Sequence, residues 1–501
     1  MIQGPIMSTK NVIIIGSGVA GMAVAIRLAV QGYAVKVFEK NDSPGGKVKA
    51  IKKVGYSFDE GPSLFTQPQN IEELFDLAGV HVRDHFTYEP VSISCQYFFE
   101  NGKTVTGWTD VSRFDDECKE KINEVPGAVN SYLRRSGKMY ENIGTPFLHH
   151  SLHKRDTWFN KKIGKALKNI RFPYLFSTLH KFNSRHFTSP EAIQIFDRFA
   201  TYNGSNPYKA PAMLSLIPHL EMNEGTYYPH GGMISITNAL FNLAKIKGVE
   251  FYFNSPVQRI IHHEGRVRGV VVNEQNLSAD IVISNGDIYF TCKDLLLDTA
   301  WSKKLLQQER SSSAVIFYWG IKKEFNQLQL HNIFFSKEYK MEFDGIFKKG
   351  NLLKDPTIYI NITQKLEKNM APAGKENWFV MVNAPANTGQ DWNELKKELR
   401  ANIIEKLNRM LDTGLEQLIE TEDSSDPVNL EKQTSSFRGS LYGTSSNSKL
   451  AAFFRQANFS GTIDGLYFCG GSVHPGGGIP LCLKSAGIVA DLIEQREKRK
   501  K

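Results

Sequence analysis

The chain has 501 residues, of which 41% are hydrophobic and 23% are charged. This length and composition are typical of a globular protein with more than one domain, and they exclude a disordered or fibrous chain. The five cysteines are widely spaced and form no C-x-x-C pair. We therefore expect a cytoplasmic protein in a reducing environment, with no structural zinc or other metal site.

The net charge of +9 is unevenly distributed along the chain. Between residues 145 and 187, nine basic residues stand against one acidic residue, Asp156. The basic residues are Lys154, Arg155, Lys161, Lys162, Lys165, Lys168, Arg171, Lys181 and Arg185. Because one segment carries nearly all of the excess charge, we expect no nucleic-acid partner.

The first predicted elements form a strand, a helix and a second strand. Residues 12–15 are β-branched and apolar, as in a buried parallel strand, and a helix is predicted over residues 19–31. Gly32 ends the helix, and residues 33–39 alternate as a second strand. Residues 12–30 are long enough to span a membrane, but their glycines favour a nucleotide-binding core. The residues before Met7 fit no pattern, so we expect Met7 to be the natural start.

The turn between the first strand and the helix reads Gly16-Ser17-Gly18-Val19-Ala20-Gly21. Gly16 permits a tight turn, Gly18 lets the backbone approach a pyrophosphate, and Gly21 lets the helix pack closely on the strand. The phosphates would lie at the helix N-terminus, where free N–H groups favour anions. Glu39 ends the second strand, where its carboxylate can accept hydrogen bonds from the ribose hydroxyls. This unit predicts a bound dinucleotide but does not distinguish NAD from FAD.

The remaining elements alternate between two styles. Residues 91–221 are aromatic, basic and helical in pattern. Further along the chain, helices are predicted over residues 232–247 and 391–411, and strands over residues 249–253, 257–261, 267–272, 280–284, 314–321, 357–362 and 378–383. A strand, a glycine-rich turn and a helix follow in residues 465–495.

We therefore expect an α/β protein in which a discontinuous Rossmann-type nucleotide-binding domain is combined with an α+β substrate domain. The substrate domain would contain an antiparallel sheet and a helical, membrane-facing segment. The nucleotide-binding domain is predicted over residues 7–90, 222–290 and 456–495, and the substrate domain over residues 91–221 and 291–455.

Two later turns carry a family resemblance. Pro44-Gly45-Gly46-Lys47 follows the second strand, and Phe58-Asp59-Glu60-Gly61-Pro62-Ser63 comes soon after it. Together with the closing segment, residues 465–480, these turns resemble the amino-oxidase-like flavoproteins, and among them the phytoene-desaturase-like carotenoid desaturases. The resemblance spans nearly the whole chain, and it implies FAD as the cofactor and a carotenoid as the substrate.

The resemblance also implies roles for individual residues. Lys47 would face the phosphates or the ribitol, Ser63 and its neighbours would lie beside the isoalloxazine ring, and the backbone of Val257 would meet the adenine. The closing turn would lead into a helix beneath the pyrimidine ring, where its dipole would stabilise the anionic reduced flavin. His474 is a candidate acid or base, although a histidine in a tight turn is more often structural. The residues expected to bind FAD are Gly16, Ser17, Gly18, Val19, Ala20, Gly21, Glu39, Lys40, Gly45, Gly46, Lys47, Gly61, Pro62, Ser63, Val257, Asn285, Gly470, Gly471, Gly478, Ile479 and Pro480.

A carotenoid C–H bond has no neighbouring carbonyl group to acidify it. The resemblance therefore implies hydride transfer to flavin N5, with loss of a proton to a weak base or water. The Gly-Gly-Lys turn, with residues 61–66 and 74–79, looks more like the hydroxycarotenoid 3,4-desaturase branch, which acts on acyclic or monocyclic, often hydroxylated carotenoids. The alternatives are a phytoene or multi-step carotenoid desaturase, a carotenoid isomerase that uses reduced flavin, and a non-enzymatic lipid-binding escort protein of the Rab GDP-dissociation-inhibitor kind.

A basic amphipathic helix is predicted in the charged segment. Apolar residues recur there at helical spacing, namely Trp158, Phe159, Ile163, Ala166, Leu167 and Ile170, and lysines and Arg171 fill the other positions. Such a helix can lie in an anionic membrane surface or pack its apolar stripe on the protein core. Because a C40 polyene must enter from lipid, we expect peripheral association with the inner face of the membrane through about residues 145–187.

Overall fold

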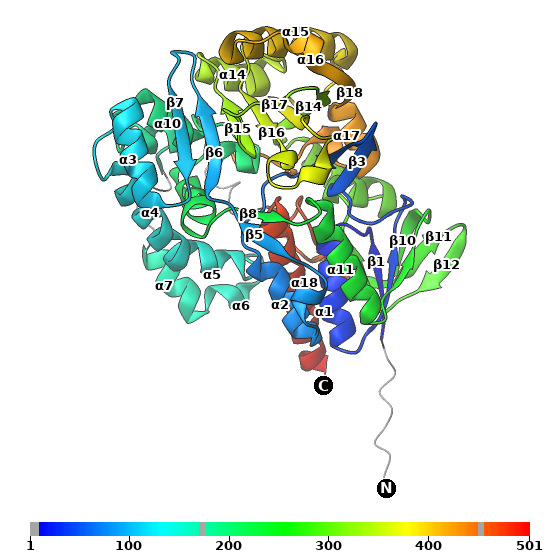
Figure 1. Cartoon of the computed structure of the whole chain (residues 1–501). Coiled ribbons are helices and arrows are strands. Elements are labelled where there is room, and N and C mark those ends of the chain that lie inside the picture. Colours follow the sequence, from blue (N-terminus) through cyan, green and yellow to red (C-terminus); the bar gives the residue numbers. More distant parts are fainter. Residues whose placement is uncertain (1–9, 170–173, 175, 449–454, 501) are drawn as a thin grey trace.

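The computed structural model describes residues 10–169, 174, 176–448 and 455–500 (Figure 1). The predicted start at Met7 lies outside these residues. Within the part of the chain that the structure describes, no helix combines the length and the apolar character that crossing a membrane requires.

A five-stranded parallel sheet forms the nucleotide-binding part of the molecule, with the strand order β19-β13-β1-β2-β9. Its strands come from distant parts of the chain. They are β1 (Asn11–Ile15), β2 (Ala34–Phe38), β9 (Glu250–Tyr252), β13 (Ile281–Ser284) and β19 (Leu466–Phe468). Pairing of β1 with both β2 and β13 places Ile14 between Val37 and Ile283 at the centre of the sheet.

Both faces of this sheet are covered, which explains the unbroken apolar run in β1. Val12 and Ile14 pack into a core made with helices on one face, and Ile13 packs into a second core on the other face. The helices are α1 (Val19–Val30), α2 (Gln69–Ala78), α11 (Ile234–Ile246) and α18 (Ile479–Lys500). The second core is closed by an antiparallel sheet of β10 (Val257–His263), β11 (Arg266–Val272) and β12 (Gln275–Ser278).

A seven-stranded sheet forms the other half of the molecule, in the order β18-β14-β17-β16-β15-β6-β7. All its pairings are antiparallel except that of β15 with β6. The strands are β6 (Ile93–Phe98), β7 (Thr104–Trp108), β14 (Ser313–Ile321), β15 (His331–Phe334), β16 (Ile358–Asn361), β17 (Glu376–Ala384) and β18 (Ile419–Ser425). The predicted antiparallel sheet is therefore confirmed, and the β6–β7 hairpin within it was missed because residues 91–221 read as helical.

The side chains of β14 alternate between the two faces of this sheet. Trp319 and the residues in phase with it pack under helix α15 (Trp392–Leu411), which covers the outer face. Ala314, Ile316 and Tyr318 lie on the opposite face, which borders the internal cavity described below. The sheet therefore separates a packed core from a ligand-sized space.

Helices from the first half of the chain pack beside this sheet, at the left in Figure 1. They are α3 (Val111–Ile122), α4 (Ala128–Met139), α5 (Thr145–Leu148), α6 (Arg155–Trp158), α7 (Lys161–Asn169), α9 (Leu179–Asn183) and α10 (Pro190–Asp197). Two small sheets pair β3 (Lys49–Lys53) with β4 (Tyr56–Glu60), and β5 (Tyr88–Pro90) with β8 (Tyr227–Pro229). The division of the chain into domains at the expected boundaries stays a prediction.

The basic helix α7 requires a correction to the expected orientation of its apolar stripe. Ile163 and Ala166 are fully buried against Ile143, Phe147 and neighbouring side chains, so this part of the stripe faces the protein core and not a membrane. Ile170 and Arg171 lie outside the described residues. Three aromatic side chains that precede or follow the helix in the sequence are exposed, namely Trp158, Phe159 and Phe176, and so are the lysines of α7.

Candidate flavin-binding site

The glycine turn between β1 and α1 is closed by the backbone. The N–H of Gly16 donates to the carbonyl of Phe38 on β2 over 2.8 Å. A Cβ at Gly21 would lie 2.3 Å from the Gly16 carbonyl oxygen, so only glycine lets α1 leave the turn at this angle. Helix α1 starts without a side-chain cap, which leaves its first N–H groups available to an anion.

Gly18 lies against the side chain of Asn285. A Cβ at this position would lie 2.7 Å from Oδ1 of Asn285, whose side chain lies against the turn. Asn285 follows β13, and its amide donates to the carbonyl of Cys469 after β19 over 3.2 Å. Gly18 therefore admits the side chain that connects the turn to the last strand of the sheet.

Glu39 is held in place by the same turn. Its Oε2 atom accepts hydrogen bonds from the N–H and the hydroxyl of Ser17, at 2.8 and 2.9 Å. Its Oε1 atom accepts from the N–H and the amide of Asn41, at 3.0 and 2.9 Å. Glu39 is 6% exposed and lines the cavity, so its carboxylate is buried and is fixed by these four hydrogen bonds.

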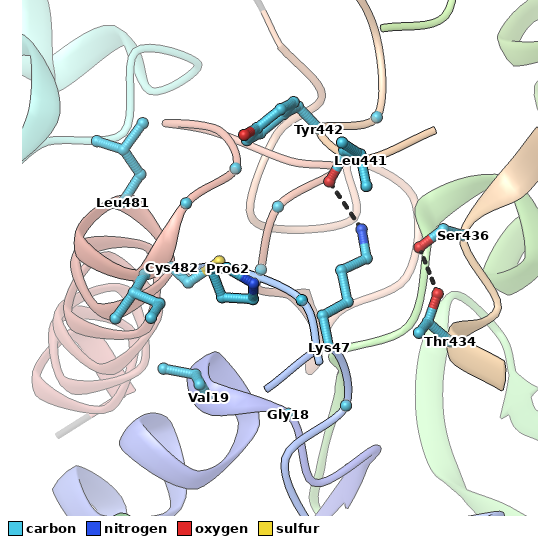
Figure 2. Close-up of a pocket in the computed structure, with 18 of the residues that line it drawn as sticks. Gly18, Val19, Lys47, Pro62, Thr434, Ser436, Leu441, Tyr442, Leu481 and Cys482 are labelled. Atoms are coloured by element: carbon cyan, nitrogen blue, oxygen red, sulfur yellow. Dashed lines mark hydrogen bonds between the residues drawn. The ribbon is translucent and has the colours of Figure 1, made fainter. Parts of the chain in front are cut away.

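Lys47 extends from the paired-glycine turn into the cavity. Figure 2 shows its side chain reaching away from Gly18 and Val19 toward Leu441, whose carbonyl accepts a hydrogen bond from Nζ over 2.7 Å. Burial lowers the pKa of Lys47 from its ordinary value, because the charged ammonium is removed from water. A half-buried cation in the cavity wall beside an uncapped helix N-terminus suits a ligand that carries phosphate charge.

The closing segment brings the C-terminal part of the chain to the cavity wall. Residues 470–478 form the bend between β19 and α18, and the N–H of Gly470 donates to the Ser485 hydroxyl over 3.2 Å. The carbonyl of His474 accepts hydrogen bonds from Asn458 and Ser485. Helix α18 therefore starts at the cavity wall and packs with α1 in one core.

His474 is buried and tied to a neighbouring helical segment. Its Nε2 atom lies 3.1 and 3.0 Å from the carbonyl oxygens of Phe147 and His150. Since a carbonyl only accepts, Nε2 carries the ring proton. Burial lowers the pKa of His474 to about 4, so the ring is neutral near pH 7. These contacts favour a structural role for His474. A catalytic role for His474 stays a prediction from the sequence.

One cavity of about 900 Å³ joins these parts, which is large among small-molecule sites. All the residues expected to bind FAD line it, except Ser17 and Gly21, which lie behind its wall. Part of its lining is apolar and comes from the helical part of the chain, including Ile143, Phe147, Leu152, Met213 and Ile217.

Polar residues that the sequence analysis missed also line the cavity, among them Arg198, Tyr202, Glu221, His331 and Tyr359. They come from segments that no local motif connects. The apolar lining would have been equally difficult to find, because its residues read as ordinary helix cores.

A parallel sheet with an uncapped helix N-terminus, a fixed carboxylate at the end of the second strand and a lysine in the cavity wall is the arrangement of a dinucleotide-binding protein. The protein comparisons specify the class. A model of the family described as flavin containing amine oxidoreductase matches residues 19–493. The chain therefore belongs to this family, and it is an FAD-dependent oxidoreductase.

Two relatives match over nearly the whole of both chains. The chain is 49% identical over 484 residues to a 1-hydroxycarotenoid 3,4-desaturase of Flavobacterium sp. (strain P99-3), covering 97% of this chain and 99% of that one. It is 33% identical to a 4,4'-diaponeurosporene oxygenase of Staphylococcus aureus (strain MSSA476), over 98% of this chain and 99% of the relative.

Among solved structures, an oxidoreductase from Methanosarcina mazei matches with a TM-score of 0.63 at 15% identity, over 97% of this chain and 100% of that chain. Putrescine oxidase bound to putrescine matches with a TM-score of 0.64 at 14% identity, over 97% of this chain and 99% of that chain. At these identities the likeness shows the fold alone.

Proposed function

We propose that the protein is a carotenoid desaturase that introduces the 3,4 double bond into an acyclic or monocyclic carotenoid with a hydroxyl at C1. The observation that carries the proposal is the single cavity, in which the nucleotide cradle continues into an apolar region. An apolar channel suits a polyene and would disfavour a charged amine. The 49% identity to a 1-hydroxycarotenoid 3,4-desaturase supports the same substrate class.

Bound FAD would supply an oxidised ring able to accept a hydride at N5. The chain would provide the surroundings. Glu39 would hold the ribose, Lys47 and the start of α1 would hold the diphosphate, and Gly61, Pro62 and Ser63 would lie beside the ring. The apolar lining residues of the helical part would hold the polyene and exclude water, and these tasks require no strongly acidic or basic group.

We propose further that the protein binds peripherally to the inner face of the membrane. The surface of α7 supports this arrangement, because Lys161, Lys162, Lys165 and Lys168 are exposed and Phe159 beside them is 87% exposed. The buried side of α7 packs against Phe147, Ile143 and Leu152, which line the cavity. A carotenoid leaving the lipid at this surface would therefore have a short path to the apolar end of the cavity.

The test uses purified protein loaded with FAD and supplied with carotenoids in liposomes. Desaturation is expected to shift the absorbance of a hydroxylated carotenoid to the red, with loss of a hydrogen pair in the product mass. Conversion of phytoene instead would favour a multi-step desaturase, a product of unchanged mass would favour an isomerase, and a gain of oxygen would favour an oxygenase. A protein that binds carotenoid and never converts it would overturn the proposal.

A further inference from the structure

Arg198 is fixed in the cavity wall by a buried cluster. Its guanidinium donates to Glu221 and Tyr97 over 3.0 Å each, and to Tyr202 over 2.6 Å. The hydroxyl of Tyr202 also donates to Glu221. The side chains of Arg198 and Glu221 are 7% and 2% exposed. An ion pair so deeply buried is costly unless its geometry is well satisfied, which makes the cluster a rigid part of the wall.

A hydrogen-bonded chain leads to the same region from the expected flavin turn. The hydroxyls of Ser63 and Tyr359 lie 2.7 Å apart, and the Tyr359 hydroxyl lies 2.7 Å from Nδ1 of His331. Asn361 Nδ2 lies 3.2 Å from the same Nδ1 and also donates to the carbonyl of Leu330. Because that amide nitrogen is a donor, Nδ1 accepts and the ring proton lies on Nε2.

Two N–H groups in this wall have no protein acceptor. Among the residues that the structure describes, Nε2 of His331 and Nε of Arg198 are buried without a hydrogen-bond partner. Burial, together with the nearby charge of Arg198, lowers the pKa of His331 to about 3, so its ring stays neutral and keeps a single proton. Because a buried donor without a partner is costly, the wall is suited to a ligand that brings a hydrogen-bond acceptor.

We infer that His331, which lies in the same cavity wall as Arg198, recognises the hydroxyl oxygen of the carotenoid by donating a hydrogen bond from Nε2. The inference rests on the proposed function, which places Ser63 beside the flavin ring. It adds the residue that distinguishes a hydroxylated from a hydrocarbon end group.

The positions of the reacting and hydroxylated carbons support this assignment. Only C2 separates C1, which carries the hydroxyl, from C3, so the oxygen lies within about 4 Å of the carbon to be oxidised. The hydroxyl must then be bound next to the flavin ring and not at a distant end of the cavity. His331 meets this requirement, because it is connected to Ser63 through the single side chain of Tyr359.

The experiment compares two carotenoids that differ only in the C1 hydroxyl, added in liposomes to the FAD-loaded protein. The flavin is kept reduced, so that no turnover occurs, and dissociation constants are read from the carotenoid absorbance. The wild type is expected to bind the hydroxylated carotenoid at least tenfold more tightly. Equal binding of the two carotenoids by the wild type would overturn the inference.

Two substitutions separate the nitrogen atoms of the ring. His331→Asn places an amide near the Nδ1 position and removes the distal donor, whereas His331→Gln places an amide N–H near the Nε2 position. The preference for the hydroxyl is expected to disappear in the first variant and to survive in the second. His331→Phe provides a second donor-free variant should His331→Asn not retain FAD, and a preference that persists without the donor contradicts the inference.

Tyr318 provides the rival explanation. It also lines the cavity, and its hydroxyl is buried without a hydrogen-bond partner among the described residues. Tyr318→Phe is expected to leave the preference intact, and its loss in this variant alone would assign the hydroxyl to Tyr318. Turnover with oxidised flavin is measured separately. Absent turnover with intact hydroxyl preference would refute the proposed reaction and leave the role of His331 standing.

Discussion

Ser17 donates two hydrogen bonds to one carboxylate oxygen of Glu39, from its N–H over 2.8 Å and from its hydroxyl over 2.9 Å. The glycine turn and the end of β2 are thereby fixed to each other before any ligand binds. A carboxylate that is already oriented would lose little conformational entropy on binding ribose hydroxyls, so this contact would prepare the proposed ribose site.

Glu39→Gln is expected to weaken FAD binding by roughly 10- to 100-fold, because hydrogen bonds to a charged acceptor contribute about 1.5–3 kcal/mol each. The dissociation constant can be measured by titrating apoprotein with FAD and following flavin fluorescence. Glu250→Gln is the matched control, since Glu250 lies on β9 of the same sheet and is exposed outside the cavity. Equal affinity of the Glu39→Gln variant and the wild type would remove Glu39 from the proposed ribose site.

Gly21→Ala is expected to lower both the melting temperature and the FAD content of the purified protein. The new Cβ would lie 2.3 Å from the Gly16 carbonyl oxygen, so α1 must move away from the glycine turn, which also forms part of the proposed diphosphate site. Gly164→Ala in α7 is the comparison, because nothing lies within 4 Å of its Cβ position. There, alanine should be neutral or stabilising by about 0.5–1 kcal/mol. Thermal unfolding and flavin absorbance per protein report both quantities.

The buried histidine at position 474 predicts a loss of stability in acid. Its folded-state pKa is lowered to about 4, whereas an exposed histidine titrates near 6.5, so the unfolded chain takes up a proton first as the pH falls. Stability contributed by the neutral ring is complete above about pH 6.5 and falls by about 2–3 kcal/mol toward pH 4.

His474→Gln retains a distal amide N–H for the carbonyls of Phe147 and His150 but has no titrating group, so its stability should depend less steeply on pH in this window. Denaturant unfolding at a series of pH values measures the slope. The control is His81→Gln, because the His81 side chain is 71% exposed. An unchanged slope in His474→Gln would show that this ring does not stay neutral in the folded protein.

Reversing the charge of α7 tests the membrane proposal. Each lysine near an anionic surface contributes about 1 kcal/mol, so converting four lysines to glutamate should reduce binding to vesicles containing anionic lipid by a hundredfold or more. The four are Lys161, Lys162, Lys165 and Lys168. Binding of the wild type should also weaken with added salt, because surface charges are screened. Co-sedimentation with vesicles measures both effects.

The control for this experiment carries the same change in net charge elsewhere on the surface. It replaces four exposed lysines of α3 and α13 (Thr299–Leu306) with glutamate, namely Lys119, Lys121, Lys303 and Lys304. If both quadruple variants lose binding equally, the attraction is a property of the overall charge and α7 is not the contact. FAD content should be unchanged in both, since none of these lysines lines the cavity.

The local parts of the fold were predictable because they depend on neighbouring residues. The helix that follows Gly18 was expected to end at Gln31 and ends at Val30, and the strand expected over residues 314–321 spans Ser313–Ile321. In both elements, apolar periodicity and flanking glycine or polar residues determine the bounds. The strands β6, β7, β15 and β18 were missed, because they are held by pairing with distant strands and their own patterns are weak.

The polar lining of the cavity could not be predicted from the sequence either. Ser63, Arg198, His331 and Tyr359 meet only because the seven-stranded sheet and the helical wall are brought together. No spacing along the chain indicates such a meeting. Asn285 was expected to contact the cofactor, and its packing against Gly18 could not be read from either segment, because it depends on the parallel pairing of β1 with β13.

The strand order β19-β13-β1 also has a consequence for biosynthesis. The strand β19 and the helix α18 are translated after every other strand of the sheet. Until they are synthesised, β13 has no strand partner on one side, and one wall of the cavity is missing. Stable capture of the nucleotide must therefore follow translation of this final portion. The nascent polypeptide needs protection from aggregation at that edge until then.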